Sequence, residues 1–304
     1  MTGDPRPTVA ELIYHKMDTL TPSERRVGRA LLANYPGAGL ASAAELAAVA
    51  QTSAPTVVRF STKIGLGGFV DLQALLRQEL PTRTASPVSR AARHYGETSI
   101  AELVVNEGVR RADLIRDSLT SIPPAELEAA VTAIADDSHA VLMVGGKYSG
   151  LIARYFHLLL RDLRRNVHFL DDPLRNDLAL VADIGRRDVV AVFDYRRYEP
   201  DAAALASIAK RRGCTVILFT DTWLSPASAW ADVVLPVNVS SSLFDTLSAA
   251  YALVESLLPA IAQRIGQSAV ERMTKVEALR AEGRAQGDLT APDSGRHRPA
   301  QRST

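Results

Sequence analysis

The stretch from Ser42 to Phe69, SAAELAAVAQTSAPTVVRFSTKIGLGGF, constrains this chain most, because it specifies two short helices joined by a tight turn. Ser42 and Glu45 form a capping box that begins the first helix: the Ser42 hydroxyl accepts the Glu45 amide proton, and the Glu45 carboxylate reaches back to the Ser42 amide. Ser53 is placed as the N-cap of the second helix, and Pro55 lies near its start, where a proline costs little.

The second of these helices has two chemically different faces. On a helical wheel its apolar side carries the core positions Val57, Phe60, Ser61 and Ile64. The roughly opposite side carries Thr56, Arg59 and Lys63, together with the exposed Ser53 end. Such a helix suits a DNA major groove, where hydroxyls and helix N-terminal amides meet phosphates and basic side chains reach base edges or backbone. A merely solvated face is the alternative, since Arg and Lys occupy most exposed helix faces.

Further helices are expected on both sides of this pair. One spans residues 9–20, and a second opens at the capping box Thr21-Pro22-Ser23-Glu24 and ends near residues 36–37. A closing helix spans Phe69 to Leu80, after a turn containing three glycines. The sequence therefore predicts a five-helix domain at residues 1–80, of a size that can fold alone.

The motifs of this region occur in a recognisable order. The run LTPSERRV is followed by AELA, TVVRF, KIGLGGF and an L-x-x-x-L-x-x-EL pattern. Together they resemble the N-terminal domain of the MurR/RpiR family of bacterial transcription regulators, over the whole of the predicted helical domain. The resemblance implies a helix-turn-helix that binds double-stranded DNA, with Ser53, Thr56, Arg59 and Lys63 at the matching positions of its DNA-facing helix.

Bulk composition limits how DNA could be bound. The chain has 304 residues, enough for two domains with separate cores, and a formal net charge of +1 at pH 7. No global positive charge drives nucleic-acid binding, so any affinity must come from a local patch, doubled by dimerisation. The candidate residues for this patch are Arg25, Arg26, Arg29, Arg59 and Lys63. Taken singly, each of the first three arginines also fits a solvated helix face.

Other protein classes find little support in the sequence. The single cysteine, Cys214, excludes a disulfide framework, and no ligand cluster for zinc accompanies it. We expect no metal and no cofactor. The N-terminus has no basic segment followed by an apolar run, and no apolar span is long enough to cross a bilayer. The expectation is a cytoplasmic protein without membrane contact.

From residue 97 to 282, apolar strands alternate with helices. Helices are expected at 100–119, 124–136, from 149 to about 165, at 205–212 and at 243–265. Strands are expected at 140–144, 167–170, 188–193, 214–220 and 232–236. This alternation predicts an α/β domain with a doubly wound parallel sheet and a pocket at the carboxyl ends of its strands. Residues 81–96 form the expected linker, and residues 283–304 an expected disordered tail.

Three interpretations fit the loop after the first strand, GGKYSG. A dinucleotide fold requires G-x-G-x-x-G, but here the glycines are spaced GG-x-x-x-G. In a second interpretation, the glycines only permit a strand-to-helix turn. The whole segment also resembles a sugar-isomerase-type (SIS) domain, which follows the same N-terminal domain in MurR/RpiR regulators. That resemblance places Gly145 and Ser149 at the positions that bind a phosphosugar.

The loop after the third strand departs from this resemblance. Phosphosugar-binding SIS domains carry S-x-S-G-x-T/S there, whereas this chain has Asp194-Tyr195-Arg196-Arg197-Tyr198. Arginine holds carboxylate or phosphate in a bidentate fork, so the effector is either an acid or a phosphate held differently. Alternatively, the two arginines pair with nearby carboxylates: Asp194, Glu199 or Asp201. Further along, Ser240, Ser241 and Ser242 match a segment that often completes the SIS pocket, or they cap the last helix.

The sequence as a whole predicts a DNA-binding regulator of metabolic genes. Its effector would be a small polar metabolite, such as a sugar phosphate, a sugar acid or another anion, and its assembly a homodimer or tetramer. The alternative is a phosphosugar isomerase-type enzyme with a regulatory domain. That enzyme needs a Glu/His acid-base pair near Ser149, and none is evident. His157 is interpreted as a packed residue of a helix, and His168 as a packed or edge residue of a strand.

Overall fold

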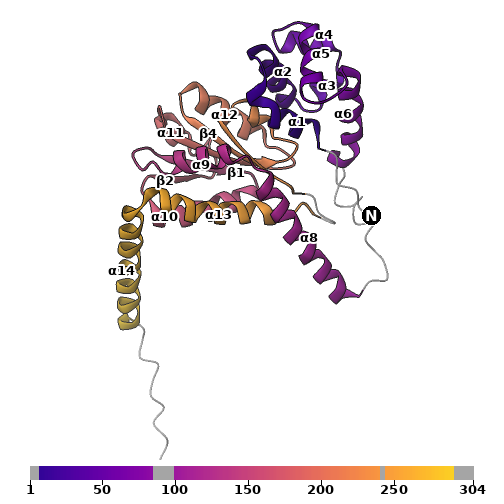
Figure 1. Cartoon of the computed structure of the whole chain (residues 1–304). Coiled ribbons are helices and arrows are strands. Elements are labelled where there is room, and N and C mark those ends of the chain that lie inside the picture. Colours follow the sequence, from indigo (N-terminus) through magenta and orange to yellow (C-terminus); the bar gives the residue numbers. More distant parts are fainter. Residues whose placement is uncertain (1–6, 85–98, 240–243, 291–304) are drawn as a thin grey trace, which may run out of the picture.

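The N-terminal domain is a bundle of short helices, drawn in indigo and purple in Figure 1. The computed structural model describes residues 7–84, 99–239 and 244–290. The helices of this domain are α1 (Val9–Lys16), η1 (Met17–Thr19, a 3₁₀ helix), α2 (Pro22–Ala33), α3 (Gly37–Leu40), α4 (Ala43–Val49), α5 (Ala54–Lys63) and α6 (Phe69–Thr84). The expected helix-turn-helix is the pair α4 and α5.

Local sequence signals account for most of these helix starts. Capping boxes begin α2 at Thr21 and α4 at Ser42, as expected, and a further one begins α1 at Thr8. The second helix of the helix-turn-helix, α5, buries Val57 and Phe60 completely in the domain core. Burial of apolar side chains at helical spacing holds this bundle together, since helices this short are marginal in isolation.

Three expectations for this half of the chain were wrong in detail. The bundle has six α-helices rather than five, because the four-residue helix α3 follows α2. The first helix ends at Lys16 and continues only as the 3₁₀ helix η1. Finally, α6 runs through Pro81 to Thr84, so the first four residues of the expected linker are helical. Its remaining residues, 85–96, lie outside the described part of the chain.

The second domain is built on a five-stranded parallel sheet. Its strands are β1 (Val141–Gly145), β2 (Val167–Leu170), β3 (Val189–Asp194), β4 (Thr215–Asp221) and β5 (Val233–Val237), all within one or two residues of the expected bounds. Their order in the sheet is β2-β1-β3-β4-β5. In this doubly wound order the strands are added on one side of β1 at β2 and on its other side from β3 onward. Ligands bind at this switch point, between β1 and β3, in such folds.

Helices cover both faces of the sheet (Figure 1). They are α8 (Ile100–Ser121), α9 (Pro124–Ala135), α10 (Ser149–Leu163), α11 (Leu178–Asp183), α12 (Pro200–Arg211) and α13 (Ser248–Ile265). Strand residues alternate between two buried clusters, as the pleat requires. Met143 and Phe219 pack with residues of α9, α10 and α13, while Val144 and Leu218 pack with residues of α11 and α12.

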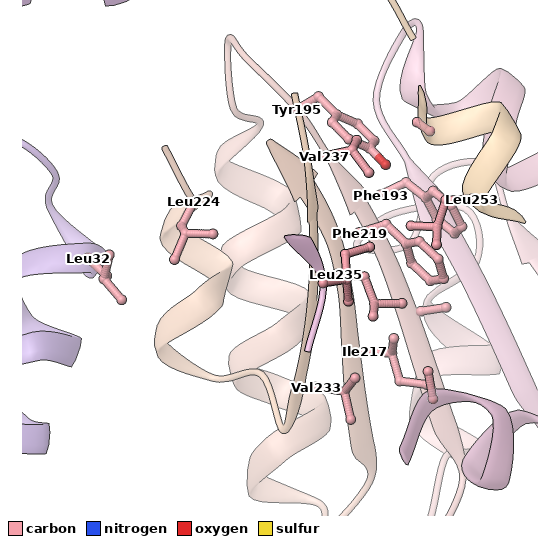
Figure 2. Packing of buried hydrophobic residues seen from close by; sticks show 14 of the residues in the cluster. Leu32, Phe193, Tyr195, Ile217, Phe219, Leu224, Val233, Leu235, Val237 and Leu253 are labelled. Atoms are coloured by element: carbon pink, nitrogen blue, oxygen red, sulfur yellow. The ribbon is translucent and has the colours of Figure 1, made fainter. Parts of the chain in front are cut away.

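The two domains touch along one side of the sheet. The Thr8 hydroxyl donates a hydrogen bond to the carbonyl of Thr222, at 3.2 Å, and the Tyr14 hydroxyl donates to the carbonyl of Val234 in β5. Leu32 of α2 and Leu224 belong to one buried cluster, and Figure 2 labels both. The segment that follows β4 therefore forms part of the contact with the helical domain.

The C-terminal end is more helical than expected. Gly266, with φ +74°, ends α13, and α14 (Gln267–Thr290) follows. The expected disordered tail began at residue 283, yet α14 continues to Thr290, because Ala, Glu, Arg and Gln favour helix even without an apolar period. Residues 291–304 lie outside the described part. None of the described helices combines the length and hydropathy that a membrane span requires.

Candidate functional site

The solvent face of α5 carries three of its four predicted DNA-contact residues. Ser53, Arg59 and Lys63 are exposed, as expected. Thr56 is not: only 6% of it is exposed, and its hydroxyl is hydrogen bonded to the Ser53 hydroxyl and to the Arg59 guanidinium. The helical wheel misplaced this residue, because Thr56 precedes the core residue Phe60 by four positions and so lies on the same side of the helix.

The exposed face includes two residues that the sequence analysis did not select, Val58 and Thr62. Ser53 occupies the N-cap position of α5, but its hydroxyl bonds to Thr56 rather than to a backbone amide. Both hydroxyls at this end of α5 are therefore engaged with each other. Arg59 is the residue whose charge is presented most directly, with Thr56 steadying one side of its guanidinium.

The expected basic patch divides into structural and free arginines. Arg25 donates to the carbonyl of Leu20, and Arg26 donates to the carbonyls of Ala50 and Gln51, in the turn between α4 and α5. The Arg25 guanidinium thus fixes a backbone carbonyl just before α2, and that of Arg26 fixes carbonyls of the helix-turn-helix. Arg29 is exposed and has no ion-pair partner among the residues that the structure describes. Only part of the patch is free to meet an anion.

A cavity of about 540 Å³ opens at the carboxyl ends of β1 and β3, where the strand order reverses. It is lined by Gly146, Lys147, Tyr148, Ser149, Asp194, Tyr195, Arg196, Arg197, Glu199, Val239, Phe244, Asp245 and Leu247. The predicted residues Ser149, Asp194, Arg196 and Arg197 therefore share one cavity.

The glycine loop is shaped by close contact between backbones. A Cβ on Gly145 would lie 2.6 Å from the amide nitrogen of Gly150, which excludes any larger residue without a shift of α10. The Ser149 hydroxyl accepts a hydrogen bond from the Gly146 amide at 2.8 Å. It therefore fixes the loop, and its proton and second lone pair leave it able to make a further hydrogen bond.

Asp194 is a buried carboxylate at the end of β3. It is 2% exposed, accepts a hydrogen bond from the Ser225 hydroxyl, and accepts a second from the Glu199 amide at 3.1 Å. Burial raises the pKa of Asp194 to about 6, although both hydrogen bonds oppose that rise. A carboxylate with these partners holds the loop between β3 and α12 in place, and it adds negative charge near the cavity floor.

The two arginines of the loop differ in their surroundings. Arg196 is paired with Asp245 at 2.9 Å, is 8% exposed in its side chain, and lies over the Trp223 ring with 4.6 Å to the centroid. Its ion-pair partner is none of the three carboxylates that the sequence suggested. Arg197 is exposed, takes φ +68°, and has no ion-pair partner among the described residues. Of the two, Arg197 is the one free to receive an anion.

Several lining residues escaped the sequence analysis. Lys147 and Tyr148 follow the glycines, and Phe244, Asp245 and Leu247 precede α13. No motif marks them, because the cavity gathers single side chains from three loops that are distant in sequence. Tyr195 follows β3 at its carboxyl end, near Phe193 (Figure 2), and its buried hydroxyl has no hydrogen-bond partner among the described residues.

The predicted serines before the last helix cannot be placed. Ser240, Ser241 and Ser242 lie outside the described residues. The alternative that they cap the last helix is wrong, because α13 begins at Ser248 and its N-cap residue is Leu247. Within the described part of the chain, no group of three or more His, Cys, Asp or Glu residues is arranged to hold a metal ion.

Comparison with protein families divides the chain in the same way as the fold. Residues 8–83 match the helix-turn-helix domain of the rpiR family, and residues 134–260 match the SIS domain. The uncharacterised HTH-type transcriptional regulator YbbH of Bacillus subtilis is 28% identical over 228 residues, covering 75% of this chain and 77% of its own. The HTH-type transcriptional regulator HexR of Pseudomonas aeruginosa is 24% identical over 210 residues, covering 69% and 72%.

Solved structures that share this fold include one that matches the second domain and one that matches both domains. The sugar isomerase domain of an RpiR transcription factor from Sphaerobacter thermophilus has a TM-score of 0.55 and 25% identity, covering 58% of this chain and 99% of its own. The NanR protein of Vibrio vulnificus, in complex with ManNAc-6P, has a TM-score of 0.52 and 16% identity, covering 88% and 97%. The second comparison covers both domains, so the fold that this chain shares with NanR includes its helical domain and its SIS domain.

Proposed function

The chain belongs to the rpiR family of helix-turn-helix transcription regulators, and we propose that it binds double-stranded DNA through α5 and a small anionic metabolite through its SIS domain. The observation that supports DNA binding is that α5 has two different sides. Its apolar side is buried in the domain, while Ser53, Arg59 and Lys63 face solvent. A short helix presented in this way, after a tight turn from α4, fits the major groove.

A DNA titration of the full chain tests this part of the proposal. Fluorescence anisotropy with duplex fragments from around the protein's own locus should show binding, which Arg59→Ala weakens at least about fivefold while reducing the salt slope. Arg77→Ala is the matched control, because Arg77 is also exposed and lies on α6. Equal affinity in the Arg59 variant and the parent would remove α5 from the interface, and indifference to every fragment at low salt would refute DNA binding.

The effector proposal rests on the cavity at the sheet's reversal point. Arg197 and Lys147 present exposed cations beside it, and the Ser149 hydroxyl lies in the glycine loop. Such groups suit an anionic sugar derivative, either a sugar phosphate or a sugar acid. The related NanR protein carries ManNAc-6P, which is consistent with a phosphosugar in a domain of this fold. In this chain the segment from Asp194 to Tyr198 replaces the hydroxyl-rich loop of phosphosugar-binding SIS domains. This replacement supports a sugar acid as the alternative to a sugar phosphate.

Thermal shift measurements on the full chain test the effector class. ManNAc-6P and gluconate are the anionic probes, and glucose is the neutral control. At least one anion should raise the melting temperature, and Arg197→Ala should abolish that rise. Equal stabilisation by glucose, or none by any sugar phosphate or sugar acid in a wider panel, would contradict an anionic effector in this cavity.

We further propose that the protein is not an enzyme and that it acts as a homodimer or tetramer. The relatives YbbH and HexR are named as regulators, which supports a binding role for the SIS domain. Apolar side chains exposed on α8 and α10, Leu103, Val104, Leu151 and Leu158, offer surface for self-association. Turnover of ketose and aldose phosphates would favour the isomerase alternative, and a monomer by light scattering at micromolar concentration would contradict the assembly. A cytoplasmic location stays a prediction.

A further inference from the structure

A second cavity, of about 530 Å³, lies away from the proposed effector cavity, beside the edge strand β2 and the C-terminal half of α10. Its lining is strongly basic: five arginines and two histidines stand against one carboxylate, Asp171. The basic residues come from α10, the segment that follows it, β2 and α14. Neither the DNA-binding face nor the proposed effector cavity shares any of these residues.

Part of this positive charge is committed to the fold. The buried Arg164 donates to the carbonyls of Ile134 and His139, and so holds the chain between α9 and β1. Arg272 donates through Nε to the Arg161 carbonyl at 2.7 Å. These bonds go to neutral carbonyls, so the charge of both guanidinium groups stays in place around the cavity.

The remaining arginines are poorly neutralised. Arg154 lies 3.6 Å from Asp171, and both side chains are more than half exposed, so this pair is weak. Arg161 and Arg165 have no carboxylate partner among the described residues. Like charges gathered without counterions repel each other, and an arginine fork binds phosphate or carboxylate oxygens in a planar, two-point arrangement.

A buried imidazole gives this cavity a specific donor or acceptor. His157, on α10, lines the cavity and is nine-tenths buried, and its Nδ1 has no hydrogen-bond partner in the part of the chain that the structure describes. Burial is the main cause that lowers its pKa, with smaller contributions from Arg161, His168 and Arg154, and a hydrogen bond with the His168 backbone opposes that shift. Buried polar atoms are nearly always paired in folded proteins, so a buried imidazole nitrogen without a described partner is a candidate to bond a ligand.

We propose that this cavity is a second ligand site, which binds a compact polyanion through Arg161, Arg165 and the imidazole of His157. The ligand chemistry is that of linked phosphates, as in inorganic pyrophosphate or the diphosphate of a nucleotide. A DNA duplex fits less well, because its phosphates remain on the outside of a wide cylinder, whereas the lining of this cavity includes the buried His157.

Calorimetry on the full chain at 150 mM salt tests the proposal, with pyrophosphate, ADP and adenosine as probes. Pyrophosphate should bind, and the double variant Arg161→Gln, Arg165→Gln should lose at least about tenfold in affinity. Arg211→Gln is the control, since Arg211 lies on α12, outside both cavities, and should bind like the parent. Binding of ADP but not adenosine would identify the nucleotide diphosphate as a source of the same chemistry.

A second readout locates the ligand within the cavity. In NMR spectra, one imidazole resonance should shift on addition of pyrophosphate, and that resonance should be absent from His157→Gln. Equal affinity in the parent and the double arginine variant would overturn the proposal, as would an unchanged His157 resonance at saturation. Displacement of pyrophosphate by a non-cognate duplex would also overturn it, because the surface would then be a nucleic-acid contact.

Discussion

The ammonium of Lys63, at the end of α5, lies 3.0 Å from a carboxylate oxygen of Glu24 in α2. The same oxygen accepts the Thr21 amide at 2.8 Å, so Glu24 caps α2 and holds α5 at once. Burial opposes the charge of Glu24, but the hydrogen bonds from Thr21 and Lys63 outweigh it and lower the pKa of the carboxyl group. Lys63 thus sets the position of the proposed DNA-facing helix.

Lys63→Met should therefore lower the free energy of unfolding by about 1–3 kcal/mol, because it leaves a buried carboxylate without its cation. The loss should be present at neutral pH and shrink as the pH falls through the lowered pKa of Glu24, where the carboxyl group is neutral in both proteins. Urea unfolding at pH 7 and pH 3 measures it. Lys63→Arg keeps the ion pair and serves as the control; a Met variant as stable as the parent would show that the contact is only a surface pair.

Asp194 should make stability fall as pH rises through the weakly acidic range. Its pKa is about 6 in the folded chain and about 3.9 in an unfolded one, so between these values only the folded state holds the proton. The free energy of unfolding of Asp194→Asn relative to the parent should therefore grow by on the order of 3 kcal/mol from pH 4 to pH 7. Asp171→Asn, at a side chain that is 84% exposed, should show no such growth. A flat difference for Asp194 would mean that the carboxylate is solvated.

The two loop arginines should separate stability from ligand binding. Arg196→Ala removes the partner of Asp245 and uncovers Trp223, and it should cost about 1–3 kcal/mol of unfolding free energy. Arg197→Ala removes an exposed side chain and should change that free energy by less than about 0.5 kcal/mol. Chemical denaturation of both variants measures the contrast. An unstable Arg197 variant would show that its side chain also holds the loop.

The sequence predicted most of the fold because its signals are local. Capping residues such as Ser42 act within one turn, and each buried strand is a short apolar run bounded by polar residues. The parallel doubly wound sheet follows from the order of those runs. The predicted linker start and tail start were wrong, because both were inferred from composition. Pro81 suggested a linker, but α6 continues past it. The end of α14 lacks an apolar stripe, yet it consists of good helix formers.

The candidate site was predictable only in part. The end of β1 and the end of β3 must come together in a doubly wound sheet, so Ser149 and Asp194 could be placed in one region from sequence. The pairing of Arg196 with Asp245 could not, because the two residues are 49 positions apart and no motif links them. The burial of Thr56 was missed for a different reason: one polar residue on the packed side of a helix looks the same in sequence as one on the open side.

The segment after β4 connects the proposed effector cavity with the helical domain, and Tyr14 tests that connection. Trp223 lies under Arg196 of the cavity, while the neighbouring Thr222 carbonyl accepts the Thr8 hydroxyl and the Val234 carbonyl accepts that of Tyr14. Tyr14→Phe should leave that carbonyl without this donor and lower the free energy of unfolding by about 1 kcal/mol.

Hydrogen exchange on the Tyr14→Phe protein should be faster in α1 than in the parent, because the contact between the domains is weakened. Tyr251→Phe is the matched control, since the structure gives the Tyr251 hydroxyl no hydrogen-bond partner among the described residues, and exchange in α1 should be unchanged there. Because the segment between Asp221 and Leu224 touches both domains, a ligand that orders the cavity should slow exchange in α1 of the parent and do so less in Tyr14→Phe. Equal slowing in both proteins would mean that the cavity reaches the DNA-binding domain by another route.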